Sequence, residues 1–312
     1  MAFNRLAPED FVVSSDSITA TLWSAGAVSL TNFYTSSTQE AGSSGDFYLN
    51  IYQTTSTSSA AAVQFAIAYG NQYGSGSSFY NNAVVGASPT KTTYGQYQVL
   101  VLGDENANFV FGGYTSSDFW VVSVDRTRYK ENLFPGSLSL KLSGSGGDIG
   151  NYITITDDSQ VAPSIIFNEA GRVYQLVSGS QGTVKTTNPN GYSANQGSYG
   201  WLLPDIGSIL LNPLALKEPA ISGGIAFNFS GSTFTGNVAY NAATNANAAL
   251  FRAMSGSSAN TFTLNSQETL TSDYIFVRPR SAEYNYSENP SFISGSTGVV
   301  KLAQTLTVTP AE

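Results

Sequence analysis

The densest group of charged side chains lies in "VDRTRYKENLFPG", residues 124–136, within a chain that has only 13 basic and 21 acidic residues in 312. Such a group can form a catalytic site, hold a partner or lock subunits together. Arginine favours bidentate carboxylate contacts at interfaces, so we expect Arg126 and Arg128 to reach carboxylates within the fold or on a neighbouring chain. The equally weighted alternative is a solvated turn whose charges contribute little to stability. The candidate ion-pair or interface residues are Asp125, Arg126, Arg128, Lys130 and Glu131.

A second basic pair, Arg278 and Arg280, lies in "FVRPRSAEYNYS". Pro279 stands between them, and proline cannot donate a hydrogen bond to a strand ladder. We therefore expect an edge strand there and count both arginines as further interface candidates.

The composition removes most enzyme chemistry. The chain has no histidine and no cysteine, which excludes Ser–His–Asp and Cys–His catalysis and cysteine-ligated metals. The sequence contains three pairs of adjacent acidic residues, Glu9-Asp10, Asp104-Glu105 and Asp157-Asp158. Such a pair could catalyse glycoside hydrolysis only if both carboxyl groups pointed toward the same substrate bond. Neighbours in a strand point to opposite faces, so turns are the favoured interpretation. We expect no catalytic residue, cofactor or metal site; a carboxylate-based glycan depolymerase is the less favoured alternative.

The low charge favours assembly. Charged residues make up 11% of the chain, against about 25% in typical domains, so a surface covered by neighbours is one explanation of its solubility. The net charge of −8 argues against nucleic acid, which is bound by clustered Lys and Arg. We see no signal peptide and no apolar run near the roughly 18 residues of a membrane helix, so we expect a chain that is soluble when made and has no membrane partner.

Aromatic residues are abundant, with 18 Tyr, 18 Phe and 3 Trp. They could form sugar-stacking platforms, but tyrosine is also enriched in half-buried strands and at protein interfaces. We favour the latter, and keep a glycan-binding adhesin as an alternative function.

The fold is predicted to be mainly β, with antiparallel strands in a sandwich or barrel-like arrangement and one or two short helices. Leu138, Leu140 and Leu142 alternate with polar residues and should face the core. "ATNANAALFRAM" (243–254) should form a helix, with Leu250 and Met254 on one face. Strands are expected at 46–53, 63–70, 96–103, 118–125, 137–144, 151–156, 163–167, 172–179, 224–229, 261–265 and 273–280.

The domain division is expected near "NPLALKEPAISGG" (212–224), where prolines and a glycine pair interrupt the strand pattern. This gives a main β-rich domain over 1–215. A smaller β-rich region with the short helix follows over 216–312.

Four segments occur in series: "DRTRYKENLFPGSLSLKLSG", "AGRVYQLVSGS", "YGWLLPDIGSILLNPLAL" and "SQETLTSDYIFVRPRSAEYNYSENPSFISGS". Together they resemble virion structural proteins of tailed bacteriophages, a group associated with cyanophages and large marine phages. The resemblance spans about residues 14–298 and implies a non-enzymatic tail or baseplate component, made in the host cytoplasm and located in the virion, whose partners are copies of itself and other virion proteins. The alternatives are a tail adhesin that binds a receptor or a host-surface glycan, and a capsid-surface protein. The resemblance also implies a further strand-rich segment at the end, where this sequence instead has "VVKLAQTLTVTPAE".

Overall fold

The chain forms two units. One comprises Ser17–Thr269, and the other comprises the two ends, Met1–Asp16 and Leu270–Glu312. The boundary expected from the sequence lies at 215/216, whereas residues on both sides of that position belong to the first unit. The structure is a computed structural model that describes residues 8–35, 48–74, 76, 89–144, 152–185, 196–219, 223–225, 243–276, 293–294 and 299–300.

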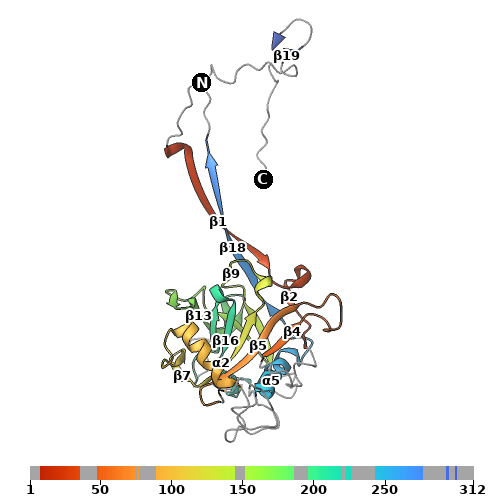
Figure 1. The fold of residues 1–312 in the computed structure, drawn as a ribbon, viewed down its shortest axis with the longest axis vertical. Helices are drawn as coiled ribbons and strands as arrows, with labels where there is room; N and C mark the ends of the chain where they lie inside the picture. Colours follow the sequence, from red (N-terminus) through yellow and green to blue (C-terminus); the bar gives the residue numbers. More distant parts are fainter. Residues whose placement is uncertain are drawn as a thin grey trace. The chain divides into compact units, whose positions relative to one another are not determined.

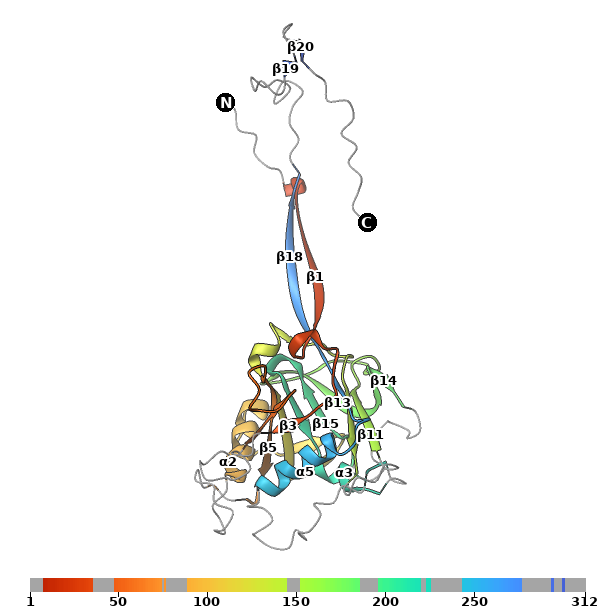
Figure 2. The same cartoon turned by 90° about the vertical axis from the view of Figure 1, so that its right-hand side faces the viewer.

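Unit Ser17–Thr269 is built on a curled sheet whose neighbouring strands are antiparallel, which confirms the mainly β prediction (Figures 1 and 2). Short strands β12 (Ile166–Asn168) and β14 (Thr183–Val184) pair with β13 beside the main path. In spatial order the main path is β2 (Ser29–Leu30), β17 (Phe262–Thr263), β10 (Ser139–Ser143), β11 (Tyr152–Asp157), β13 (Gly171–Ser180), β15 (Gly200–Leu203), β16 (Ser208–Leu211), β8 (Asp118–Val124), β5 (Val63–Asn71), β4 (Tyr48–Tyr52) and β3 (Tyr34–Thr35).

Both faces of the central strands are buried, which explains why β8 is an almost unbroken apolar run. Trp120 and Val122 point into one hydrophobic cluster, and Phe119 and Val121 point into another. A strand that is covered on both sides has no reason to alternate apolar with polar residues. The second cluster is rich in aromatic residues and includes side chains of helix α2 (Thr90–Tyr97) and of strand β6 (Phe109–Phe111). Strand β6 forms a hairpin with β7 (Tyr114–Ser116).

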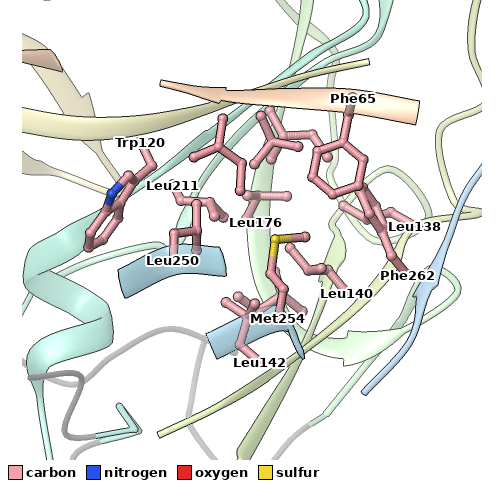
Figure 3. Close-up of a cluster of buried hydrophobic side chains, with 14 of the residues drawn as sticks. Phe65, Trp120, Leu138, Leu140, Leu142, Leu176, Leu211, Leu250, Met254 and Phe262 are labelled. Atoms are coloured by element: carbon pink, nitrogen blue, oxygen red, sulfur yellow. The ribbon is translucent and has the colours of Figure 1, made fainter. Parts of the chain in front are cut away.

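Helix α5 (Ala243–Ser255) covers the first cluster, as Figure 3 shows. Leu250 and Met254 are fully buried there, which confirms the predicted helix and its apolar face. Leu138, Leu140 and Leu142 come to the same cluster, as their alternation predicted. Trp120 Nε1 donates a hydrogen bond to the Ala246 carbonyl, so strand and helix are also joined through a polar contact. A third short helix, α3, spans Pro213–Lys217.

The strand expected at 96–103 is wrong. The chain instead ends helix α2 in a π-helical turn, η3 (Gln98–Leu102), closed by Gly103 at φ 69°. Gln98 and Val101 are buried while Val99 and Leu100 are exposed, which is helical spacing. A short apolar run such as "VLVL" fits both periods, so the pattern alone could not distinguish them.

Pro135 and Gly136 form a turn. Ser137 N–H donates to the Phe134 carbonyl, and Gly136 has φ 87°. Proline followed by a residue with positive φ is the pattern of a type II turn. This turn separates β9 (Asn132–Leu133) from β10. The strand expected at 224–229 lies almost wholly outside the described residues.

The longest described strands are β1 (Phe11–Thr21) and β18 (Asn265–Ile275), which run side by side as a two-stranded ribbon (Figures 1 and 2). β18 also pairs with β9, through Ser266 with Leu133 and Gln267 with Asn132. In the unit formed by the chain ends, β19 (Ile293–Ser294) pairs with β20 (Val299–Val300). Single-turn 3-10 helices occur at Pro8–Asp10, Ser24–Gly26, Arg126–Arg128 and Pro204–Ile206.

Candidate functional site

The charged turn, Asp125–Glu131, does not continue strand β8. The strand ends at Val124, and Asp125 begins a 3-10 turn by accepting a hydrogen bond from Thr127 N–H at 2.9 Å. Aspartate is a favoured cap because its side chain satisfies amides that the turn leaves without a partner. Arg126 and Arg128 therefore do not share a strand face.

The two arginines bind neutral oxygens of their own chain. Arg126 donates to the Tyr129 and Lys130 carbonyls, and its guanidinium lies 4.6 Å from the Tyr129 ring centroid. Arg128 donates to Ser24 Oγ at 2.6 Å and to the Thr127 hydroxyl. The ion pairs of the described residues are Lys130–Glu268 and Arg172–Asp205, so neither Arg126 nor Arg128 reaches a carboxylate there. Contact with a neighbouring chain stays a prediction.

Lys130 and Glu131 tie the charged turn to strand β18. Lys130 Nζ lies 2.8 Å from Glu268 Oε1, and Glu131 Oε2 accepts a hydrogen bond from Thr269 N–H at 2.8 Å. The Lys130 side chain is 75% exposed, so this ion pair is screened by solvent. The charged turn thus binds strand β18 of the same chain through one ion pair and one hydrogen bond. It is neither the ion-pair network nor the fully solvated turn considered from the sequence.

An open pocket of about 390 Å³ lies beside the charged turn, lined by Asp125, Arg126 and Tyr129 together with residues of β5 and β8. Both terminal nitrogens of Arg126 already donate to carbonyls. The charged group in this pocket is therefore the Arg126 guanidinium, which packs on the Tyr129 ring and already donates hydrogen bonds within its own chain.

The best-formed ion pair lies between residues that the sequence did not single out. Arg172 Nη2 lies 2.6 Å and its Nε 3.1 Å from Asp205 Oδ1, and Arg172 N–H donates to Asp205 Oδ2. Burial acts to raise the pKa of Asp205, but the hydrogen bonds and charge of Arg172 outweigh it and lower that pKa. Each residue follows a turn residue, Gly171 or Pro204, yet nothing in a separation of 33 positions links them.

The side chains of Asp157 and Asp158 accept hydrogen bonds from backbone amides. Asp157 Oδ2 accepts a hydrogen bond from Gly136 N–H at 2.7 Å, and Asp158 Oδ1 accepts one from Gln175 N–H at 2.9 Å. Burial raises the pKa of Asp157, and it raises that of Asp158 to about 6. Of the two side chains, that of Asp157 also accepts a hydrogen bond from a nearby amide, that of Ser159 at 3.4 Å. The interpretation of this adjacent pair as a local turn therefore holds in part, because the two carboxyl groups mainly bind amides of distant segments.

An exposed apolar surface lies where residues 11–13 of β1 run beside residues 274–276. Six apolar residues there are between 44 and 56% exposed. Monomeric proteins rarely leave so many large apolar side chains together in water. We call this set the apolar ribbon end: Phe11, Val12, Val13, Tyr274, Ile275 and Phe276.

A second exposed apolar group surrounds β12, which pairs only with β13 in the described sheet. Val161, Ile165, Ile166 and Phe167 are each at least 51% exposed. An apolar edge strand with free backbone groups is a template for pairing with another chain.

One further pocket, of about 410 Å³, lies over strands β11, β13 and β14. Its lining combines the half-exposed ring of Tyr152 with hydroxyls of Thr154 and Ser180 and with Lys185. Lys141 Nζ lies 4.2 Å from the centroid of the Tyr152 ring. An aromatic ring can stack against a sugar, and hydroxyls beside the ring can hydrogen-bond to that sugar.

Arg278 and Arg280 lie outside the described residues. Within the described residues, no group of three or more acidic side chains could hold a metal ion. No helix among them is long and apolar enough to span a membrane. Compared with known proteins, the chain matches no protein-family model, no curated protein and no solved structure.

Proposed function

We propose that the chain is a structural component of a tailed-phage virion, in the tail or baseplate, that acts by protein–protein assembly. The observation that carries the assembly part is the apolar ribbon end, which leaves both faces of a two-stranded ribbon exposed. An isolated two-stranded ribbon is marginally stable in water, so a partner that buries these side chains would stabilise it.

The rest of the molecule agrees with such a role. The β12 edge offers a second apolar surface, and charged residues are few in the chain as a whole. Interfaces are depleted in charged residues at their centre and enriched in aromatic ones. The virion part of the proposal rests on the resemblance of the four sequence segments.

Mass spectrometry of purified particles from the virus that encodes the chain tests the proposal. We expect its peptides in multiple copies per particle, with an antibody label at the tail or baseplate in negative-stain images. Washed particles that lack the chain would refute the virion role.

A receptor- or glycan-binding adhesin is the second candidate, favoured by the pocket at Tyr152. A glycan array should then show specific binding that Tyr152→Ala abolishes. Tyr114→Ala, at another exposed tyrosine, is the matched control and should leave binding unchanged. An array without a specific signal would remove this candidate.

A further inference from the structure

The apolar ribbon end has apolar side chains on both faces. Phe276 N–H donates to the Asp10 carbonyl at 2.8 Å, and ten residues along each strand Ser266 Oγ donates to the Ala20 carbonyl. The equal spacing indicates an antiparallel pairing without a bulge. Since side chains alternate between faces, Phe11, Val13 and Ile275 lie on one face, and Val12, Tyr274 and Phe276 lie on the other.

The exposed area is large for so narrow an element. With residue surfaces of about 150–250 Å² and roughly half of each exposed, the six residues present on the order of 500 Å² of mostly apolar surface. The largest apolar patch on a typical monomer is about 300–600 Å², and a standard interface takes about 800 Å² from each partner. Because the six residues divide between the two faces, each face offers on the order of 250 Å², so a contact through one face alone is small and both faces are needed to bury the patch.

The charged residues of this part of the ribbon indicate which kind of partner it can bind. Residues 10–16 and 270–276 contain three carboxylates, Asp10, Asp16 and Asp273, and no Lys or Arg. A surface of this kind does not attract nucleic acid or an acidic lipid headgroup, because both need cations. An apolar face of the same composition is a suitable partner, and a second copy of the chain supplies one.

We infer that the apolar ribbon ends of several copies pack face to face in a closed ring of three or more chains. A two-fold dimer through one face would leave the other face in water. A contact in which one face of each ribbon meets the opposite face of the next covers both faces. A closed ring of such contacts leaves no apolar face in water, whereas an open filament leaves one at each end. This inference deepens the proposed assembly function and rests on it.

The absence of cysteine from the sequence makes a clean cross-linking test possible. In the double variant Val13→Cys/Tyr274→Cys, the two thiols lie on opposite faces of one ribbon. Mild oxidation of the full-length protein should give a ladder of covalent species that reaches at least the trimer. The control Val28→Cys/Tyr114→Cys places thiols at exposed apolar positions of unit Ser17–Thr269, so it should form the same ring but give no ladder of covalent species.

Three outcomes would overturn the inference. A ladder that stops at the dimer contradicts the ring. Monomers whose cysteines react freely with a maleimide contradict any ribbon contact, and monomers with protected cysteines show that another segment of the same chain covers the ribbon. Particle mass spectrometry is independent of this test: a chain found in virions but not cross-linked refutes the ring alone, and a cross-linked chain absent from virions refutes the virion role alone.

Discussion

At the scale of residues, the strongest ionic contact and the most conspicuous charges are different groups. The arginines of the charged turn donate hydrogen bonds to carbonyl and hydroxyl oxygens rather than to carboxylates. The Lys130 side chain is mostly exposed to water. Arg172 and Asp205 are both less exposed and share three hydrogen bonds of good length. Ion pairs of this bidentate kind are stronger than exposed lysine pairs.

Replacing the partly buried arginine should therefore cost more than replacing the exposed lysine. We expect Arg172→Ala to lower the free energy of unfolding by about 1–2 kcal/mol, because it leaves Asp205 without its partner. Lys130→Ala is the control and should cost less than about 0.5 kcal/mol. Urea unfolding followed by tryptophan fluorescence measures both; equal losses would contradict the ranking.

Asp158 gives the stability a pH dependence. Burial raises its pKa in the folded chain to about 6, above the roughly 3.9 of an unfolded aspartate. Between these values the folded chain holds a proton that the unfolded chain has lost. Through this group, stability therefore falls as the pH rises from about 4 to about 6, and the loss is complete above that window.

Asp158→Asn removes the buried charge and keeps an oxygen that can accept the hydrogen bond from Gln175 N–H. After a discount for partial exposure, we expect it to be more stable than the wild type by about 1 kcal/mol at pH 8. The difference should vanish near pH 4. Unfolding curves over this range would refute the account if the difference were the same at every pH.

At the scale of elements, the sequence predicted strands best where periodicity was clear. "SLSLKL" places its leucines inward, and the helix at 243–254 buries Leu250 and Met254. The apolar run at 99–102 was ambiguous because it fits either period, and Gly103 closes it as a helical turn. The Arg172–Asp205 pair was not predictable, because only the pairing of β13 with its neighbours brings the two residues together.

The packing of α5 on the sheet should show in a single substitution. Leu250 is fully buried in the main cluster, so Leu250→Ala should lower the free energy of unfolding by about 2–4 kcal/mol. Arg252→Ala changes an exposed position of the same helix and should cost less than about 0.5 kcal/mol. Thermal unfolding of both variants measures the contrast, and similar melting temperatures would mean that α5 is not part of the cooperative core.

At the scale of the whole molecule, the proposed assembly would account for both the low charge and the exposed apolar strands. A chain with 11% charged residues leaves large side chains of β1, β12 and β18 in water when it is alone. The sequence predicted assembly from composition, but it placed the candidate contacts at the charged turn. The exposed ribbon could not be foreseen, because "FVVSSDSITAT" has the composition of an ordinary half-buried strand.

Light scattering of the purified full-length chain, coupled to size-exclusion chromatography, tests assembly through the ribbon most directly. We predict a molar mass of at least three times 32.9 kDa for the wild type. Val13→Glu/Tyr274→Glu should return the monomer, while Val28→Glu/Tyr114→Glu, which adds the same charge elsewhere, should keep the wild-type mass. A wild-type mass of 32.9 kDa at every concentration would contradict the account.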